Sequence, residues 1–277
     1  MRKLNSLLMI MLVATLGITS CKKDNAGNAA HPKTETKATA GVTARTIDAD
    51  PGNPLNPYDD FGVMHNYLLN AVKPTMLSEG ATISACYDGV VAAFPGSTTY
   101  MSTHKDVIIA YATGVYEDGV NKYANIIAGS GLSAGAKAFA HAIENVLFDL
   151  EPYETYEDYK AAIIDIETAV QASTLSAAEK AVLLKMGATA RYSFLFWSEI
   201  ILDKIDAAGT GATMRGGPGK WYADVRAWIK LHKAEMIGIA TDVSSYLGNT
   251  LKTPPMDSGD AAAIASVASL IAFILAL

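Results

Sequence analysis

Apolar residues recur at helical spacing in the middle of the chain. From residue 156 onward, steps of four, three and four separate Tyr159, Ile163, Ile166 and Val170. An α-helix turns once every 3.6 residues, so these side chains share one face. Thr155 and Asp158, just before and inside this stretch, have the spacing of a capping box. We therefore predict a helix that begins at residue 156.

A longer helix is predicted directly after it. Ser176 and Glu179 form the S-x-x-E pattern of a second capping box. The apolar stripe that follows consists of Leu183, Met186, Ala190, Phe194, Trp197, Ile201 and Ile205. About 30 residues of helix rise roughly 45 Å. The second half, YSFLFWSEIIL, is apolar nearly all round, which is typical of a helix at the centre of a bundle.

The stretch NPYDDFGVMHNYLLNAV predicts the first helix of the domain. Phe61, Met64, Leu68 and Val72 make one face, and His65 falls within it. Asn56 is a candidate N-cap, and Pro57 suits the first helical position. Asp59 and Asp60 would then lie in the first turn, where each carboxylate gains about 0.3–1 kcal/mol from the helix dipole.

The remaining patterns are also helical. A face runs through Trp221, Val225, Trp228, Ile229, His232, Met236 and Ile239, after a glycine-rich break that lacks the spacing of a phosphate loop. Residues 83–131 mix β-branched residues with glycines and predict shorter helices. We expect an all-α protein, a single-domain helical bundle over residues 56–252 with a long central helix at about 177–206.

The chain begins like an exported lipoprotein. Arg2 and Lys3 precede an apolar run that ends in Ile18-Thr19-Ser20-Cys21. That ending resembles the lipobox of bacterial lipoproteins, which implies cleavage after residue 20 and lipidation of Cys21. Residues 21–55 are poor in large apolar side chains and predict a flexible tether. The expected localisation is the outer membrane, lipid-anchored, with display at the cell surface.

Composition narrows the function classes. The formal net charge is −6 and the basic residues form no patch, so we do not expect nucleic-acid binding. Of two cysteines, lipidation takes Cys21, and Cys86 in its apolar setting is expected to be a free buried thiol. No metal-ligand or cofactor motif occurs, so we expect neither a metal nor a cofactor.

One pentapeptide has the pattern of a hydrolase nucleophile. Residues 131–135 read GLSAG, which would make Ser133 the nucleophile if it lay on a strand-to-helix turn. The helical context argues against that role. GLSAGAKAF also echoes TLSAAEKAV at residues 174–182, where the second serine begins a helix. We therefore expect Ser133 to be a helix cap.

Histidines give the other catalytic candidates. His65 and His232 both lie on apolar helical faces, where a core histidine bonded to a carbonyl is the simpler interpretation. A functional pocket remains an alternative if the two helices face each other. His141 and Glu144 fall opposite an apolar face and are expected to be a solvated pair.

The last 17 residues carry no charge. Residues 257–277 predict an apolar C-terminal helix, with larger side chains on one face and small ones on another. The sequence leaves three roles open for it: packing in the bundle, insertion into a neighbouring membrane, or contact with a partner or a second copy through residues 261–277.

Three segments resemble a group of Bacteroidota lipoproteins without an established activity. They are NPYDDFGVMHN at 56–66, LSAAEK at 175–180 and ARYSFLFW at 190–197. The resemblance implies an N-P-Y-D-x-x-G-x-x-H-N motif near the mature N-terminus and a helical lipoprotein. It carries over no catalytic residue.

Three functions therefore remain as hypotheses. The first is a non-enzymatic, surface-tethered helical lipoprotein that binds a partner in the cell envelope. The second is a membrane-active protein that inserts its C-terminal helix. The third is an enzyme with a pocket formed by His65 and His232.

Overall fold

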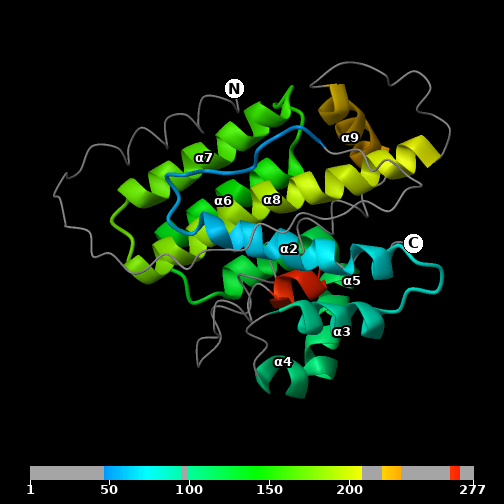
Figure 1. Ribbon diagram of the computed structural model, residues 1–277. Coiled ribbons are helices and arrows are strands. Elements are labelled where there is room, and N and C mark those ends of the chain that lie inside the picture. Colours follow the sequence, from blue (N-terminus) through cyan, green and yellow to red (C-terminus); the bar gives the residue numbers. More distant parts are fainter. Residues whose placement is uncertain (1–46, 95–98, 208–219, 232–262, 269–277) are drawn as a thin grey trace. The chain divides into compact units, whose positions relative to one another are not determined.

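The computed structural model describes residues 47–94, 99–207, 220–231 and 263–268 (Figure 1). Within these ranges the chain is helical with no strand, which confirms the all-α prediction. The helices are α2 (Asp59–Met76), α3 (Ile83–Ala93), α4 (Thr99–Thr103), α5 (Lys105–Gly129), α6 (Ala134–Phe148), α7 (Tyr156–Ala172), α8 (Ala177–Ala207) and α9 (Lys220–Leu231). A further short helical segment spans residues 263–268.

Helix α8 is the centre of the domain, as its sequence predicts. It runs for 31 residues and packs against α2, α6, α7 and α9. Phe194, Trp197 and Ile201 on this helix are fully buried. The helix is buried around most of its circumference because neighbours cover it on several sides, which explains why its second half is apolar all round.

The turns that precede α6 and α8 are built alike, as their sequences predict. Ser133 Oγ accepts from the Ala136 amide at 3.3 Å, and Ser176 Oγ accepts from the Glu179 amide at 3.2 Å. In both turns a lysine donates to a carbonyl at the end of the previous helix: Lys137 to Ala128 at 2.7 Å, and Lys180 to Gln171 at 2.8 Å.

Glu179 joins these two turns. Its carboxylate accepts from the Ser176 amide at 3.1 Å, which completes the capping box, and from the Ser133 amide at 2.9 Å. Hydrogen bonds from Ser133 and Ser176 lower the pKa of Glu179 to about 2. One carboxylate therefore satisfies donors at the start of both α6 and α8.

Residues 47–58, here called the strap, belong to the folded domain. Ile47 and Asn53 are only 9% and 3% exposed. Three pairs of contacts show that the strap runs antiparallel to α8: Ile47 with Glu199, Pro51 with Arg191, and Asn56 with Leu184. The expected tether boundary at residue 55 is therefore wrong, because side chains elsewhere in the chain bind the strap's backbone and amides.

Two further predictions need correction. Helix α2 begins at Asp59 with Tyr58 at the N-cap position, and no side chain caps it. Asn56 is not the N-cap of α2, because its Oδ1 accepts from the Tyr58 amide at 2.9 Å in the turn before the helix, while its Nδ2 donates to Glu167 and Leu184. Within residues 83–131, α3 and α4 are short helices as predicted, but α5 is a single helix of 25 residues. Its glycines cost only about 0.5–1 kcal/mol each, which a helix packed in a domain can absorb.

The described part of the C-terminal region packs inside the domain. All six residues from 263 to 268 are buried, and Ser266 Oγ donates to the His65 carbonyl at 3.4 Å. Among the roles considered for this region, these contacts favour packing in the bundle. Residues 257–262 and 269–277 lie outside the described part. Among the described helices, none is both long and apolar enough to cross a membrane.

The first prediction concerns Glu179. We expect Glu179→Gln to lower the free energy of unfolding by about 1 kcal/mol, measured by urea titration at pH 7, because capping bonds are weakened. The folded pKa is depressed from an ordinary 4.5, so this contribution is present above pH 4.5 and is lost as the pH falls towards 2. Glu79→Gln, in the exposed turn after α2, is the control. Equal effects of the two substitutions at pH 7 would contradict the capping role.

Candidate functional site

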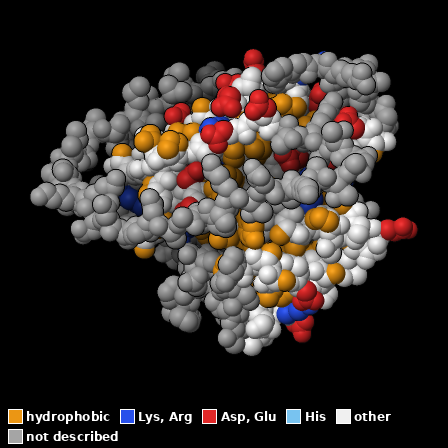
Figure 2. All heavy atoms as spheres, in the orientation of Figure 1, with side chains coloured by type: hydrophobic (Ala, Val, Ile, Leu, Met, Phe, Trp, Pro, Cys, Tyr) orange, Lys and Arg blue, Asp and Glu red, His pale blue; other side chains and the backbone are white. Residues whose placement is uncertain are grey.

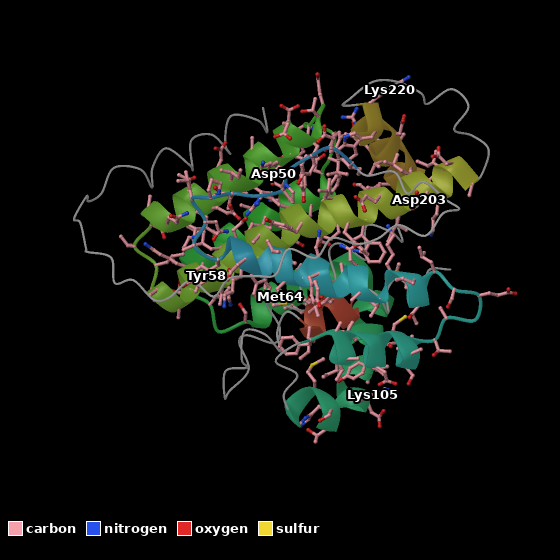
Figure 3. The ribbon with its side chains drawn as sticks, viewed as in Figure 1. Asp50, Tyr58, Met64, Lys105, Asp203 and Lys220 are labelled. Carbon is pink, nitrogen blue, oxygen red and sulfur yellow. The ribbon has the colours of Figure 1, made fainter. Side chains whose placement is uncertain are left out.

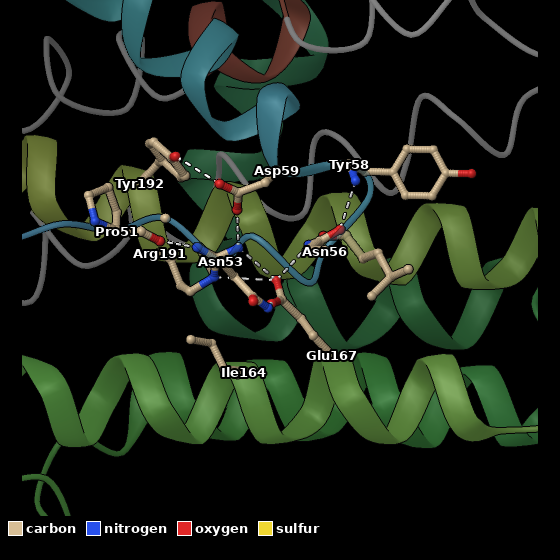
Figure 4. A network of polar contacts seen from close by, with 12 residues as sticks. Pro51, Asn53, Asn56, Tyr58, Asp59, Ile164, Glu167, Arg191 and Tyr192 are labelled. Carbon is tan, nitrogen blue, oxygen red and sulfur yellow. Dashed lines mark hydrogen bonds and ion pairs between the residues drawn. The ribbon is translucent and has the colours of Figure 1, made fainter. Parts of the chain in front are cut away.

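The most distinctive polar feature of the domain is a network centred on Arg191 (Figure 4). Arg191 lies on α8 and is fully buried. Its guanidinium donates to Glu167 Oε1 on α7, at 3.0 Å from Nη2 and 3.3 Å from Nε, and to Asp59 Oδ1 on α2 at 2.5 Å. It also donates to the Pro51 carbonyl of the strap. One side chain therefore binds three separate parts of the chain.

Glu167 is the second centre of the network. It is fully buried and accepts from Asn53 Nδ2 at 2.6 Å and from Asn56 Nδ2 at 2.9 Å. Burial raises the pKa of Glu167, while Arg191 and the two amides oppose that rise. Its described hydrogen-bond partners are all donors, which is the arrangement that an ionised carboxylate requires.

The network extends to the contact between α2 and α8. Tyr192 Oη donates to Asp59 Oδ2 at 3.0 Å, and Asn66 Nδ2 donates to the Tyr192 carbonyl at 2.9 Å. Asn56 Nδ2 also donates to the Leu184 carbonyl at 2.8 Å. Polar groups at the start of α2 are therefore paired with groups of α8. The carboxylate of Asp59 binds Arg191 as well as lying in the first helical turn.

Two glycines make room for this network. A Cβ added at Gly187 would lie 2.4 Å from Glu167 Oε1, and one at Gly62 would lie 2.3 Å from the Tyr192 ring. Contacts that short require the neighbour to move. Neither neighbour is free to do so cheaply, because hydrogen bonds hold the Glu167 carboxylate and the Tyr192 hydroxyl. Both glycines therefore permit close approach between helices.

The chemistry of the network is that of an internal clamp. Arg191 lies between Asp59 and Glu167, so its positive charge disfavours a metal ion between the two carboxylates. In the described part of the chain, no group of three or more His, Cys, Asp or Glu side chains has metal-binding geometry. The oxygens of both acids accept hydrogen bonds from residues of this chain.

Of the two candidate histidines, only His65 lies in the described part of the chain. It is fully buried on α2, as its apolar face predicts, and its Nδ1 lies 3.2 Å from Asn66 Oδ1. Its backbone carbonyl contacts Ser266. His232 lies outside the described residues, so the proposed pairing of these histidines stays a prediction.

The other candidate residues, Ser133, His141 and Glu144, lie at the start of α6 or within it. Ser133 is the N-cap of α6 in a turn that follows α5, so its cap role is confirmed and no strand precedes it. His141 Nδ1 lies 2.7 Å from Glu144 Oε2. The pair is not fully solvated as expected, because the Glu144 side chain is only 12% exposed against 44% for His141. Glu144 faces inward because it lies one position from Ile143 on the buried side of α6.

Of the two cysteines, only Cys86 lies in the described part of the chain. Cys86 is fully buried and free, as predicted, and burial raises the pKa of its thiol. Cys21, the predicted lipidation site, lies outside the described residues.

Sequence reasoning missed the network, although it left two traces. Glu167 lies at helical spacing between Ile163 and Val170, on the buried face of α7. Arg191 lies among apolar residues in the stripe of α8. An ionisable residue on an apolar face is rarely buried unless it is paired. A negative residue on the apolar face of one predicted helix and a positive residue on that of the next could therefore have indicated a buried ion pair.

Comparison of the chain with known proteins gives no match among family models, curated proteins or solved structures. The function is therefore inferred from the residues and contacts of this chain.

The glycine contacts give the second prediction. Gly187→Ala and Gly62→Ala should each lower the free energy of unfolding by about 1–3 kcal/mol, because the new methyl groups overpack a filled contact. Gly114→Ala, in α5, is the matched control. A Cβ there meets nothing within 4 Å, so it should stabilise by up to about 1 kcal/mol through helix propensity. If all three substitutions changed the free energy of unfolding in the same direction in urea titrations, Gly62 and Gly187 would not be needed for close approach between helices.

Removing Arg191 gives the third prediction. Arg191→Leu should lower the free energy of unfolding by about 3–5 kcal/mol at pH 7.5, because it leaves Glu167 charged and buried. Lys230→Leu is the control, since Lys230 and its partner Glu151 are 53% and 63% exposed; it should change the free energy of unfolding far less than Arg191→Leu does.

The same variant has a defined pH dependence. Without Arg191 the folded chain retains the Glu167 proton to a higher pH than the unfolded chain does. The free energy of unfolding falls with rising pH wherever the folded state binds more protons than the unfolded state. The loss of stability caused by Arg191→Leu should therefore become smaller as the pH is lowered towards 5. A defect that is constant across this range would show that the loss is one of packing alone.

Proposed function

We propose that this chain is a lipid-anchored outer-membrane protein, of the Bacteroidota type that it resembles, whose helical domain binds a partner in the cell envelope without catalysing a reaction. The observation that carries the proposal is the sequence Ile18-Thr19-Ser20-Cys21 after a short apolar run. A lipid on Cys21 would hold the domain at a membrane surface through the residues that precede the strap.

The chemistry of the domain supports binding over catalysis. The carboxylates of Asp59 and Glu167 bind Arg191 and the strap, so they are engaged within the chain. A catalytic acid or base instead needs a hydrogen bond to the proton that it transfers. Ser133 serves a turn in the same way.

The surface supplies groups that suit protein contact. Val63 and Tyr67, one turn apart on α2, are 49% and 52% exposed. Figure 2 shows apolar side chains interspersed with acidic ones on the face that it presents. Because a non-obligate interface is about as apolar as the rest of a protein surface, a face of this kind is compatible with protein binding.

The fourth prediction tests the anchor. In a diderm bacterial host fed an alkyne-labelled palmitate, the full chain should incorporate label and fractionate with the outer membrane, and Cys21→Ala should abolish both. Cys86→Ala is a matched control, because it removes the only other cysteine and should leave both unchanged. Label on the Cys21→Ala chain, or none on the native chain, would overturn the anchor.

The non-catalytic part has a separate test. The purified full chain should show no turnover above that of a denatured sample when metals and common hydrolase substrates are supplied. Turnover that scales with chain concentration and is abolished by His65→Gln would favour the enzyme hypothesis instead.

A further inference from the structure

The strap is attached along its length by polar side chains of α7 and α8. Lys160 Nζ donates to the Asp50 carbonyl at 2.6 Å, and Gln171 Nε2 donates to the Leu55 carbonyl at 3.1 Å. Arg191 donates to the Pro51 carbonyl between them. Figure 3 labels Asp50 and Tyr58 near the two ends of this path. The backbone of the strap is therefore bound from both helices.

Apolar burial contributes little to this attachment. Ile47 is the one strap residue with a buried apolar side chain, Ala49 and Tyr58 are partly buried against the core, and Leu55 is 71% exposed. The other buried strap side chains are the amides of Asn53 and Asn56. Segments with few buried apolar contacts have small free energies of local opening, so we expect the strap to separate from the helical core at a lower cost than the buried helices α7 and α8.

The strap contacts converge on Glu167. Both buried amides of the strap donate to its carboxylate, and the carboxylate also orients the guanidinium that binds the Pro51 carbonyl. A neutral carboxyl would offer a weaker acceptor to the amides and would lose its attraction for Arg191. The charge on Glu167 therefore controls the bonds of both buried strap amides and supports the guanidinium that binds Pro51. The bonds from Lys160 and Gln171 at the two ends of the strap do not depend on it.

The charged groups around Glu167 are Arg191 from α8 and, beyond the guanidinium, Asp59 from α2. The strap contributes two neutral amides to Glu167 itself, and the charge of its Asp50 acts on the neighbouring hydroxyls of Tyr156 and Tyr192. The hydroxyls of Tyr156 and Tyr192 nearby have pKa values raised by burial, so they stay neutral in the acidic range. Burial also raises the pKa of Glu167. Glu167 is therefore the group near the strap whose protonation in acid would weaken the strap's contacts.

We propose that the strap is a latch closed by the Glu167 carboxylate, and that it separates from α7 and α8 when this carboxylate is neutral, while the helices stay folded. Opening would free about 12 residues, or roughly 40 Å of extended chain. On the proposed lipid anchor this would let the domain move further from the membrane. Only this consequence rests on the anchor, since the latch itself follows from the contacts.

The experiment is hydrogen exchange measured by mass spectrometry on the full chain in detergent micelles. At pH 7.5 we expect Glu167→Gln to lower the protection of peptides covering residues 47–58 at least tenfold, with the protection of α7 and α8 retained. Asp165→Asn, an exposed acid on the same helix, is the matched control and should leave the strap protected. The Cys21→Ala chain should behave as the native chain does, which separates failure of the latch from failure of the anchor.

The pH dependence gives a second readout on the native chain. After correction for intrinsic exchange rates, strap protection should fall as one proton binds, at a pH where the helical core is still protected. In Glu167→Gln this pH dependence should disappear, because the titrating group has been removed.

A third variant keeps the test informative if Glu167→Gln does not fold. Asn53→Asp changes only the strap, and it places a second carboxylate beside Glu167. We expect the strap to be open at pH 7.5 and to regain protection in acid, because two carboxyls can share one proton. Strap protection equal to that of the native chain in both variants, or lost only together with that of α7 and α8, would overturn the latch.

Discussion

The burial of Arg191 is the constraint on which the arrangement of the domain depends. A guanidinium cannot be neutralised by losing its proton, and moving it out of water is costly unless its donors and charge are matched. The matching charges and acceptors for Arg191 come from α7, α2 and the strap together. These three parts must therefore reach the same point on α8 if the helix is to be buried.

Apolar packing and the network determine different properties. The buried side chains of α8 supply a large non-directional driving force, which many rotations of neighbouring helices would satisfy. The bonds of Arg191 are directional, and Gly62 and Gly187 leave room at the points where Tyr192 and Glu167 come close to the neighbouring helix. We infer that the apolar faces hold the helices together, while the network and its glycines select how they are oriented.

The sequence predicted what depends on local spacing. Helices α7 and α8 followed from apolar period and from capping residues within three positions of each other. The network joins residues that are more than 20, and up to 140, positions apart, and helical period does not say which faces meet. Asn56 shows the limit: its side-chain oxygen makes a local bond to the Tyr58 amide, as the local pattern suggests, but the pattern gives no sign that its nitrogen bonds to Glu167.

The network also changes how the sequence motifs are interpreted. Segments 56–66 and 191–197 meet in the structure through Asp59 and Arg191, and again through Asn66 and Tyr192. Their polar residues thus account for packing between α2 and α8, and they do not need a substrate to explain them. What they position is the strap, the point where the chain leading from the predicted lipid enters the domain. In the latch that we propose, a polar network at that point, with little apolar burial behind it, couples the position of the strap to the charge of one carboxylate.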